Sequence, residues 1–164
     1  MDKKDLSERD IITKFLIPGI QKAGWDIKTQ IREEVFFTDG RIFVKGQKTV
    51  RGERKRADVI LYYKPNIPIA IIEAKDNKHS IGAGMQQGLD YAAILDIPIV
   101  FSSNGDGFLE HDSTLSSGRI ERTLDLDNFP SPEELWEKYK KFKGIKTHAQ
   151  ETIISHDYFF DGSG

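Results

Sequence analysis

The sequence predicts an α/β fold in which a mixed, mostly antiparallel sheet is flanked by helices on both faces. Two β-rich apolar runs, 58–63 and 68–75, are separated only by a short Lys-Pro-Asn turn, so they must pair antiparallel. A helical segment at 81–95 then leads to a third buried run at 97–103. This strand–helix–strand order implies a right-handed parallel crossover.

The first helix is expected to begin at Ser7, which can act as its N-cap with Asp10 three residues later. Pro18 should kink or split this helix, and Gly24 should end it. Its core-facing residues follow at helical spacing: Ile11, Ile12, Phe15, Leu16, Ile20 and Ala23.

The remaining elements surround this central unit. Residues 27–32 alternate as a strand does, and residues 35–50 predict a hairpin around Thr38-Asp39-Gly40-Arg41. A short strand is expected at 108–110. The pattern Ser131-Pro132-Glu133-Glu134 is typical of a helix start, and this helix should run to about Phe142.

Length and composition restrict the class of protein. With 164 residues, of which 38% are hydrophobic, the chain can form one compact domain and is not generally disordered. The absence of Cys excludes disulfides and Cys-ligated metal sites. The N-terminus is polar, and no apolar run approaches the ~20 residues of a membrane span. We therefore expect a cytoplasmic protein with no membrane partner.

The formal net charge of −2 hides a strong segregation of charge along the chain. Residues 41–56 hold seven basic residues and one acidic residue, whereas residues 106–137 hold nine acidic and two basic residues. The acidic segment is interpreted as surface. The basic segment suits a partner that carries phosphates, although it also fits a solvated loop. The candidate phosphate contacts are Arg51, Arg54, Lys55 and Arg56.

Glu73 and Lys75 are the strongest candidates for chemistry. They are two apart at the end of an apolar strand, so both side chains point to the same face. Asp58 opens the neighbouring antiparallel strand and can lie near Glu73. Two carboxylates form a hard oxygen site suited to Mg²⁺, and an adjacent Lys can assist metal-dependent hydrolysis of a phosphodiester. The same Glu-x-Lys spacing also fits a surface ion pair at a strand end.

Gln87 and Tyr91 share one face of the expected helix because they are four residues apart. That face can look back toward the carboxylates. Alternatively, Tyr91 belongs to the core and Gln87 is merely exposed.

The combination of Asp58, Glu73-Ala74-Lys75 and Gln87-x-x-x-Tyr91 resembles the PD-(D/E)xK nuclease superfamily, whose RecB-like branch carries the Gln-x-x-x-Tyr element. Over residues 6–143 the chain is similar to the N-terminal part of type I restriction enzyme R (HsdR-like) subunits. The motifs that follow in the same order are Ala23–Asp26, Arg56–Asp58, Ile72–Lys75, Gln86–Ala92, Ser103–Phe108 and Phe129–Trp136.

This resemblance implies a restriction-endonuclease-like core and a set of residue roles. Asp58 and Glu73 would bind Mg²⁺, with the main-chain carbonyl of Ala74 as a third ligand, and Mn²⁺ would substitute. Lys75 would be the catalytic lysine. Glu8 would complete the metal shell, or would merely favour the helix dipole. Gln87 and Tyr91 would position DNA or brace the site.

The resemblance also implies biological context. The domain, 1–143, would be an endonuclease that hydrolyses DNA phosphodiester bonds in a type I restriction-modification complex, which defends against foreign DNA. Its partners would be double-stranded DNA and the modification and specificity subunits. In the family, an ATP-driven translocase follows the nuclease, and no Gly-x-x-x-x-Gly-Lys-Ser/Thr motif occurs here. The chain is therefore expected to be a fragment whose tail, 144–164, leads to an absent motor, and ATP would serve that motor only.

One departure from the pattern and two alternatives accompany this interpretation. Ala57 stands where the superfamily name has a Pro, which is often missing in the family. The domain could instead be a catalytically silent docking or DNA-binding module of the same complex. It could also be a stand-alone nuclease of the same superfamily.

Overall fold

The computed structural model describes residues 2–38, 41–42, 54–115, 118 and 120–144. Within these residues, seven strands form one sheet in the order β2-β1-β3-β4-β5-β6-β7. Among the described strands, β4 and β5 pair in parallel and every other pair is antiparallel, so the predicted mixed, mostly antiparallel sheet is confirmed. The strands are β1 (Ile31–Thr38), β2 (Arg41–Ile42), β3 (Lys55–Lys64), β4 (Ile67–Ala74), β5 (Ile99–Ser103), β6 (Phe108–Asp112) and β7 (Glu121–Leu124).

The first helical segment starts with the predicted capping box. The Ser7 hydroxyl accepts a hydrogen bond from the Asp10 main-chain N–H at 3.0 Å, and the Asp10 carboxylate accepts one from the Ser7 N–H at 3.3 Å. The helix widens into a π-helical turn before Pro18, which has no N–H to donate. The segment comprises α1 (Glu8–Ile11), the π-helical turn η2 (Ile12–Leu16) and α2 (Ile17–Lys22).

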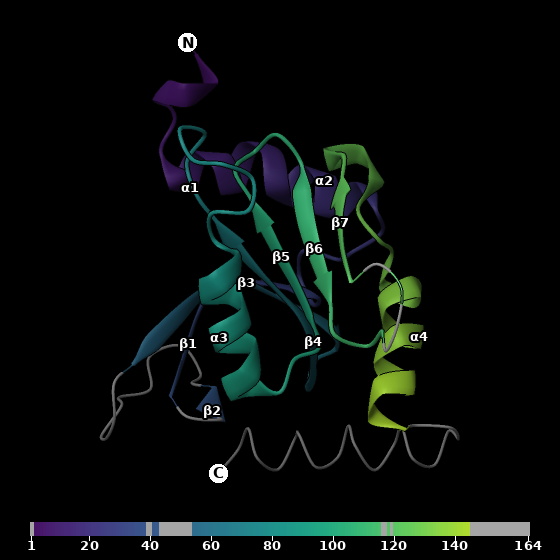
Figure 1. Cartoon of the computed structure of the whole chain (residues 1–164). Helices are drawn as coiled ribbons and strands as arrows, with labels where there is room; N and C mark the ends of the chain where they lie inside the picture. The colour runs from purple at the N-terminus through teal and green to yellow at the C-terminus, as the bar shows by residue number, and fades with distance from the viewer. Residues whose placement is uncertain (1, 39–40, 43–53, 116–117, 119, 145–164) are drawn as a thin grey trace.

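Helices cover both faces of the sheet (Figure 1). On one face, α1, α2 and α4 (Pro132–Lys143) enclose a core that contains Val59, Ile72 and Phe101. On the other face, α3 (Met85–Leu95) packs over Ile60, Ile71 and Val100. Adjacent residues of each central strand therefore enter different cores, as expected for strands buried on both sides. Short 3₁₀ turns lie at Lys3–Asp5 and Leu126–Asn128.

Two predicted elements start several residues before the observed ones. The strand expected at 27–32 is wrong for residues 27–30, which form a turn. Asp26 produces this turn because its carboxylate accepts from the Lys28 N–H and its carbonyl accepts from the Gln30 N–H, both at 2.8 Å. The helix expected at 81–95 begins only at Met85.

The predicted hairpin is described only near its turn. Thr38 pairs with Arg41 and Phe37 pairs with Ile42, in the antiparallel register that a hairpin requires. The turn residues 39–40 and the remainder of the predicted segment, 43–50, lie outside the described residues.

The acidic segment, interpreted as surface, is partly buried. Glu110 and Asp112 on β6 are each 1% exposed, and the prediction is wrong for these two residues. Glu110 receives the Arg122 guanidinium from β7, a strand that the sequence analysis missed, at 2.7 Å. Asp112 receives the Lys138 ammonium from α4 at 2.8 Å. Opposite charges from two other elements make burial of these carboxylates tolerable.

The final helix ends where the sequence analysis placed its limit. Gly144 caps α4 in the left-handed region, with φ of 71°, which glycine adopts without a steric penalty. The rest of the predicted tail, 145–164, lies outside the described residues. Across the part of the chain that the structure describes, no helix combines the length and hydrophobicity needed to span a membrane.

Candidate active site

Asp58 and Glu73 face each other where β3 and β4 leave their regular pairing. The paired register ends at Val59 and Ile72, and one step beyond it Asp58 lies opposite Glu73. There the Asp58 main-chain N–H donates to Glu73 Oε2, and the Ala74 N–H donates to Asp58 Oδ2, both at 2.8 Å. Both residues are buried, with 6% and 3% exposed. The structure therefore brings together the two predicted carboxylates.

Their proximity is unfavourable without a cation. Burial, and then the nearby charge of Asp58, raises the pKa of Glu73 to about 8. Burial also raises the pKa of Asp58, although the Ala74 N–H and the neighbouring Arg56 oppose this effect. Two buried carboxylates that resist full ionisation are typical of a site that gains a positive charge when it functions.

Lys75 and Glu8 complete this charge cluster. The Lys75 main-chain N–H donates to the Ser103 carbonyl at 2.9 Å, which fixes the backbone just after β4. Its ammonium acts electrostatically on Glu8, Asp58 and Glu73, yet makes no hydrogen bond or ion pair with any described residue. Glu8 comes from α1, and burial followed by the charge of Asp58 raises its pKa. The cluster thus combines three acidic side chains that interact electrostatically with one ammonium, which no described residue pairs with.

Gly84, just before α3, and Gly88, within it, lie close to Glu73, and sequence analysis did not assign either glycine to the site. A Cβ at Gly84 would lie 3.2 Å from Glu73 Cβ, and a Cβ at Gly88 would lie 3.5 Å from Glu73 Cγ and only 2.6 Å from Val100 Cγ1. The buried Ser102 hydroxyl accepts from the Gly84 N–H at 3.0 Å. The spacing of four residues between the glycines was the available signal for a close helix–sheet contact.

Gln87 and Tyr91 do share a helix face, as predicted. Gln87 Nε2 donates to the Tyr91 hydroxyl at 2.6 Å, and the Tyr91 ring packs edge-on against Phe37 with centroids 5.0 Å apart. Among the described residues, neither side chain hydrogen-bonds to Asp58, Glu73 or Lys75. A role for this pair in positioning DNA stays a prediction.

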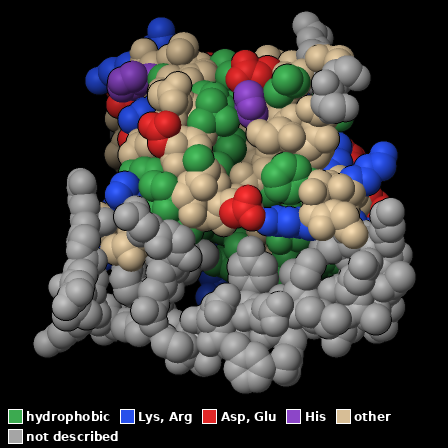
Figure 2. Space-filling model, turned by 60° about the horizontal axis from the view of Figure 1, so that its bottom comes forward, with side chains coloured by type: hydrophobic (Ala, Val, Ile, Leu, Met, Phe, Trp, Pro, Cys, Tyr) green, Lys and Arg blue, Asp and Glu red, His purple; other side chains and the backbone are tan. Residues whose placement is uncertain are grey.

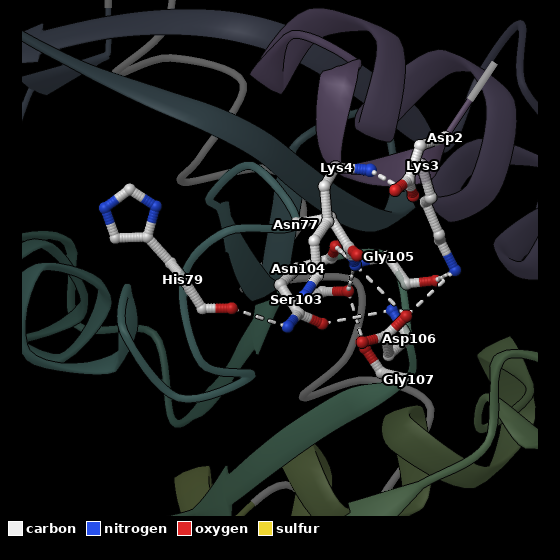
Figure 3. Close-up of polar contacts among 10 residues, drawn as sticks. All are labelled: Asp2, Lys3, Lys4, Asn77, His79, Ser103, Asn104, Gly105, Asp106 and Gly107. Carbon is white, nitrogen blue, oxygen red and sulfur yellow. Dashed lines mark hydrogen bonds and ion pairs between the residues drawn. The ribbon is translucent and has the colours of Figure 1, made fainter.

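The loops that follow β4 and β5 are tied to each other and to the N-terminal segment (Figure 3). Asn77 Nδ2 donates to the Asn104 carbonyl at 2.8 Å, and Asn104 Nδ2 donates to the His79 carbonyl at 2.7 Å. Lys3 Nζ pairs with Asp106 at 3.0 Å. These bonds connect loops at adjacent strand ends and so restrict the backbone that carries Lys75.

The predicted phosphate contacts are not all on one surface element. Arg54 stacks on the Phe36 ring at 4.6 Å, Lys55 opens β3, and Arg56 lies 3.7 Å from Asp58 Oδ1. Arg51 lies outside the described residues. On the face shown in Figure 2, acidic and basic side chains of the described residues are interspersed with apolar and polar ones.

The donor set fits a hard divalent cation of the magnesium type. Across the described residues, no group of three or more His, Cys, Asp or Glu side chains is arranged to hold a metal ion. Mg²⁺ in proteins commonly takes only one or two carboxylates and completes its octahedral shell with waters and substrate oxygens. Asp58 Oδ1 and Glu73 Oε1 are the oxygens that do not accept the crossed main-chain hydrogen bonds. The complete ligand set, including Glu8 and the Ala74 carbonyl, stays a prediction.

Comparison with known proteins gives consistent matches. Residues 42–115, which include Asp58, Glu73, Lys75, Gln87 and Tyr91, match the family described as type I restriction enzyme R protein N terminus. The chain is 52% identical over 165 aligned positions to the type I restriction enzyme EcoAI endonuclease subunit of Escherichia coli. That alignment covers 100% of this chain and 20% of the relative.

A solved structure agrees in both sequence and fold. It is the fragment structure of a putative HsdR subunit of a type I restriction enzyme from Vibrio vulnificus YJ016, with 41% identity and a TM-score of 0.70. The match covers 86% of this chain and 27% of the other. The chain thus spans about a fifth to a quarter of the length of these two proteins. In sequence over its whole length, and in fold over most of it, the chain is thus similar to R subunits of type I restriction enzymes, and residues 42–115 match the family model of their N terminus.

Proposed function

We propose that this domain is a PD-(D/E)xK nuclease that hydrolyses DNA phosphodiester bonds with Mg²⁺, as part of a type I restriction-modification complex. One observation carries the proposal. Asp58 and Glu73 are buried side by side where the pairing of β3 with β4 ends, and the Lys75 ammonium acts electrostatically on both without a hydrogen bond or ion pair to any described residue.

The carboxylates would hold the ion through Asp58 Oδ1 and Glu73 Oε1, because their other oxygens accept main-chain hydrogen bonds. When bound, Mg²⁺ would polarise the phosphodiester and lower the pKa of the attacking water. The crossed hydrogen bonds keep both carboxylates in place before the ion arrives, which reduces the reorganisation that binding requires.

Lys75 would act on the substrate rather than on the ion. Its ammonium lies near the carboxylates and can approach a phosphate oxygen placed between them. As the phosphate becomes pentacoordinate, negative charge grows on its equatorial oxygens, and a fixed ammonium stabilises that charge more than the charge of the ground state. Lys75 therefore contributes to the rate more than to metal affinity.

The proposed partners are double-stranded DNA and the modification and specificity subunits of the complex. The domain contacts the DNA backbone without reading its sequence, and target choice belongs to the specificity subunit. ATP hydrolysis is assigned to the motor of such complexes and not to these residues.

A calorimetric titration with Mn²⁺, with a short DNA duplex present, tests the proposal without requiring the other subunits. We expect Asp58→Ala to abolish Mn²⁺ binding and Lys75→Ala to retain it, while both variants lose Mn²⁺-dependent cleavage. Glu137→Ala is the matched control, because Glu137 is exposed on α4 and pairs only with Lys140 among the described residues.

Equal Mn²⁺ binding by the wild type and Asp58→Ala would reject Asp58 as a ligand. If Lys75→Ala also cleaved DNA as the wild type does within the complete enzyme, the domain would be a docking or DNA-binding module instead.

A further inference from the structure

Two arginines from different elements meet at one carboxylate oxygen beside Asp58. Arg9 Nη2, from α1, and Arg56 Nη1, from β3, each lie 3.6 Å from Glu34 Oε1. The two guanidinium nitrogens are therefore at most 7.2 Å apart, twice that distance. A separation of 3.6 Å is too long for a good hydrogen bond, so Glu34 compensates the charges without being tightly bound.

The other terminal nitrogen of each arginine faces a second carboxylate. Arg9 Nη1 donates to Glu33 Oε1 at 2.5 Å, and Arg56 Nη2 lies 3.7 Å from Asp58 Oδ1. The Arg9 and Arg56 side chains are 45% and 47% exposed, whereas Asp58 is 8% exposed at its side chain. The pair thus stands at the solvent-facing side of the buried carboxylates.

The backbone of Glu34 departs from ordinary strand geometry. Its φ is 53°, in the left-handed region, although it lies inside β1. The residues on either side of it pair with Val59 and Ala57, so Glu34 lies directly opposite Asp58 while making no regular pair there. A non-glycine residue in this region is strained, and such positions cluster at functional sites. This distortion places the Glu34 carboxylate between the two arginines.

We propose that Arg9 and Arg56 form a phosphate-binding pair for the DNA backbone, and that Glu34 Oε1 occupies the place of a phosphate oxygen until DNA displaces it. A guanidinium fork matches a phosphate better than an ammonium does, and two forks facing one point suit an anion with several oxygens. The Glu34 side chain is 52% exposed and can turn into solvent when a phosphate enters. The inference rests on the proposed function for its ligand, and it adds Arg9 and Glu34 to the residues of the site.

The test measures binding of a short fluorescent DNA duplex by anisotropy, in EDTA and over a series of NaCl concentrations. We expect Arg9→Gln and Arg56→Gln each to weaken binding about tenfold, as for a lost charged hydrogen bond. Each should also reduce the slope of log K against log salt by about 0.9, the value for one phosphate contact. Glu34→Gln should tighten binding, because it removes the competing anion.

Lys22→Gln is the matched control. Lys22 is an exposed cation at the end of α2, in the helical segment that begins with the helix of Arg9, and it pairs with Asp127. If Arg9→Gln changed affinity and slope no more than Lys22→Gln does, Arg9 would not contact phosphate. Weaker binding by Glu34→Gln would reject the displacement. This second variant stays informative even where Arg9→Gln disturbs folding, because loss of structure does not tighten DNA binding.

The outcome is separable from that of the nuclease proposal. The binding assay contains no metal, so Asp58 and Glu73 have no ion to hold in it. If Arg9→Gln weakens DNA binding but the wild type binds no Mn²⁺, the phosphate-binding pair is supported and the nuclease proposal is rejected. If the wild type binds Mn²⁺ but Arg9→Gln binds DNA as the wild type does, the nuclease proposal is supported and the phosphate-binding pair is rejected.

Discussion

The main-chain N–H of Asp58 donates a hydrogen bond to the Glu73 carboxylate, while the Asp58 carboxylate accepts one from the residue that follows Glu73. At this point the strands are thus joined by bonds from a main-chain N–H to a carboxylate, where regular pairing would use main-chain carbonyls. A local break in sheet pairing leaves two main-chain N–H groups, and each of them holds a carboxylate of the opposite strand. The hydrogen bonds that order the site also hold the Asp58 and Glu73 carboxylates close together. The repulsion between these carboxylates has measurable consequences.

The first consequence concerns Asp58→Asn. The amide oxygen can still accept from the Ala74 N–H, but the charge beside Glu73 is gone. Because the pKa of Asp58 is raised, its surroundings favour the neutral group on balance. We therefore expect the free energy of unfolding in EDTA to rise, because the neutral amide removes the repulsion between two buried carboxylates. Urea denaturation measures it.

Asp58→Ala serves as the comparison, because it also removes the acceptor of the buried Ala74 N–H. It should be less stable than Asp58→Asn by about 1–2 kcal/mol, the cost of an unsatisfied buried donor. A metal-free Asp58→Asn protein less stable than the wild type would contradict the idea that charge repulsion dominates here.

The second consequence is a pH dependence of stability. The pKa of Glu73 is about 8 in the folded chain and 4.5 as its ordinary value, so the folded state holds this proton more tightly. The resulting stabilisation is fully present below pH 4.5 and is lost as the pH rises toward 8. In EDTA, the free energy of unfolding should fall over this range by at most about 1.4 kcal/mol per pH unit.

Glu73→Gln should flatten this decline, and saturating Mg²⁺ should oppose it, because the ion binds the ionised pair. Glu137→Gln, at an exposed position, should leave the profile unchanged. Urea denaturation at several pH values measures the profile. If the free energy of unfolding of the wild type instead rose between pH 5 and 8, the raised pKa of Glu73 would be rejected.

Local sequence patterns predicted much of the fold and the carboxylate site. The features that they missed depend on contacts between residues far apart in the sequence. The Ser7 capping box and the antiparallel β3–β4 pair follow from residues close in sequence. The burial of Asp112 depends on Lys138, 26 residues away, and no periodic pattern in the sequence predicts that contact. Arg9 meets Glu34 through side chains that lie far apart in the sequence, and the left-handed φ of Glu34 has no glycine to signal it.

The pair formed by Asp112 and Lys138 yields a third prediction. Burial alone would raise the pKa of Asp112, but hydrogen bonds from Lys138 and Thr114 hold it below its ordinary value. This stabilisation is present above about pH 3.8 and is lost as the pH falls through the lower folded-state pKa. At neutral pH, Lys138→Met should lower the free energy of unfolding by about 3 kcal/mol, because it leaves a buried carboxylate without its cation.

Lys141→Met on the exposed side of the same helix is the control and should change stability by less than about 0.5 kcal/mol. Thermal or urea denaturation at pH 7 compares them. Equal effects of the two substitutions would mean that the ion pair adds nothing beyond the surface charge.

The last prediction concerns the contact between α3 and the site. In an exposed helix, Gly→Ala raises stability by up to about 1 kcal/mol. At Gly88, however, the added Cβ would lie 2.6 Å from Val100 Cγ1, and the stiff valine cannot turn away. We expect Gly88→Ala to lower the free energy of unfolding by about 1–3 kcal/mol, the usual cost of overpacking. It should also weaken Mn²⁺ binding, because relief of the clash shifts the helix that packs against Glu73.

A double-mutant cycle isolates the cause. Val100→Ala alone opens a cavity and should cost about 2 kcal/mol, but it also removes the methyl group that blocks Ala at position 88. The combined Gly88→Ala and Val100→Ala protein should therefore be more stable than the sum of the two single effects, by at least about 0.5 kcal/mol. Ala93→Gly, on the exposed face of α3, reports the helix propensity alone. Additive effects in the cycle would show that contact with Val100 does not limit how closely α3 approaches Glu73.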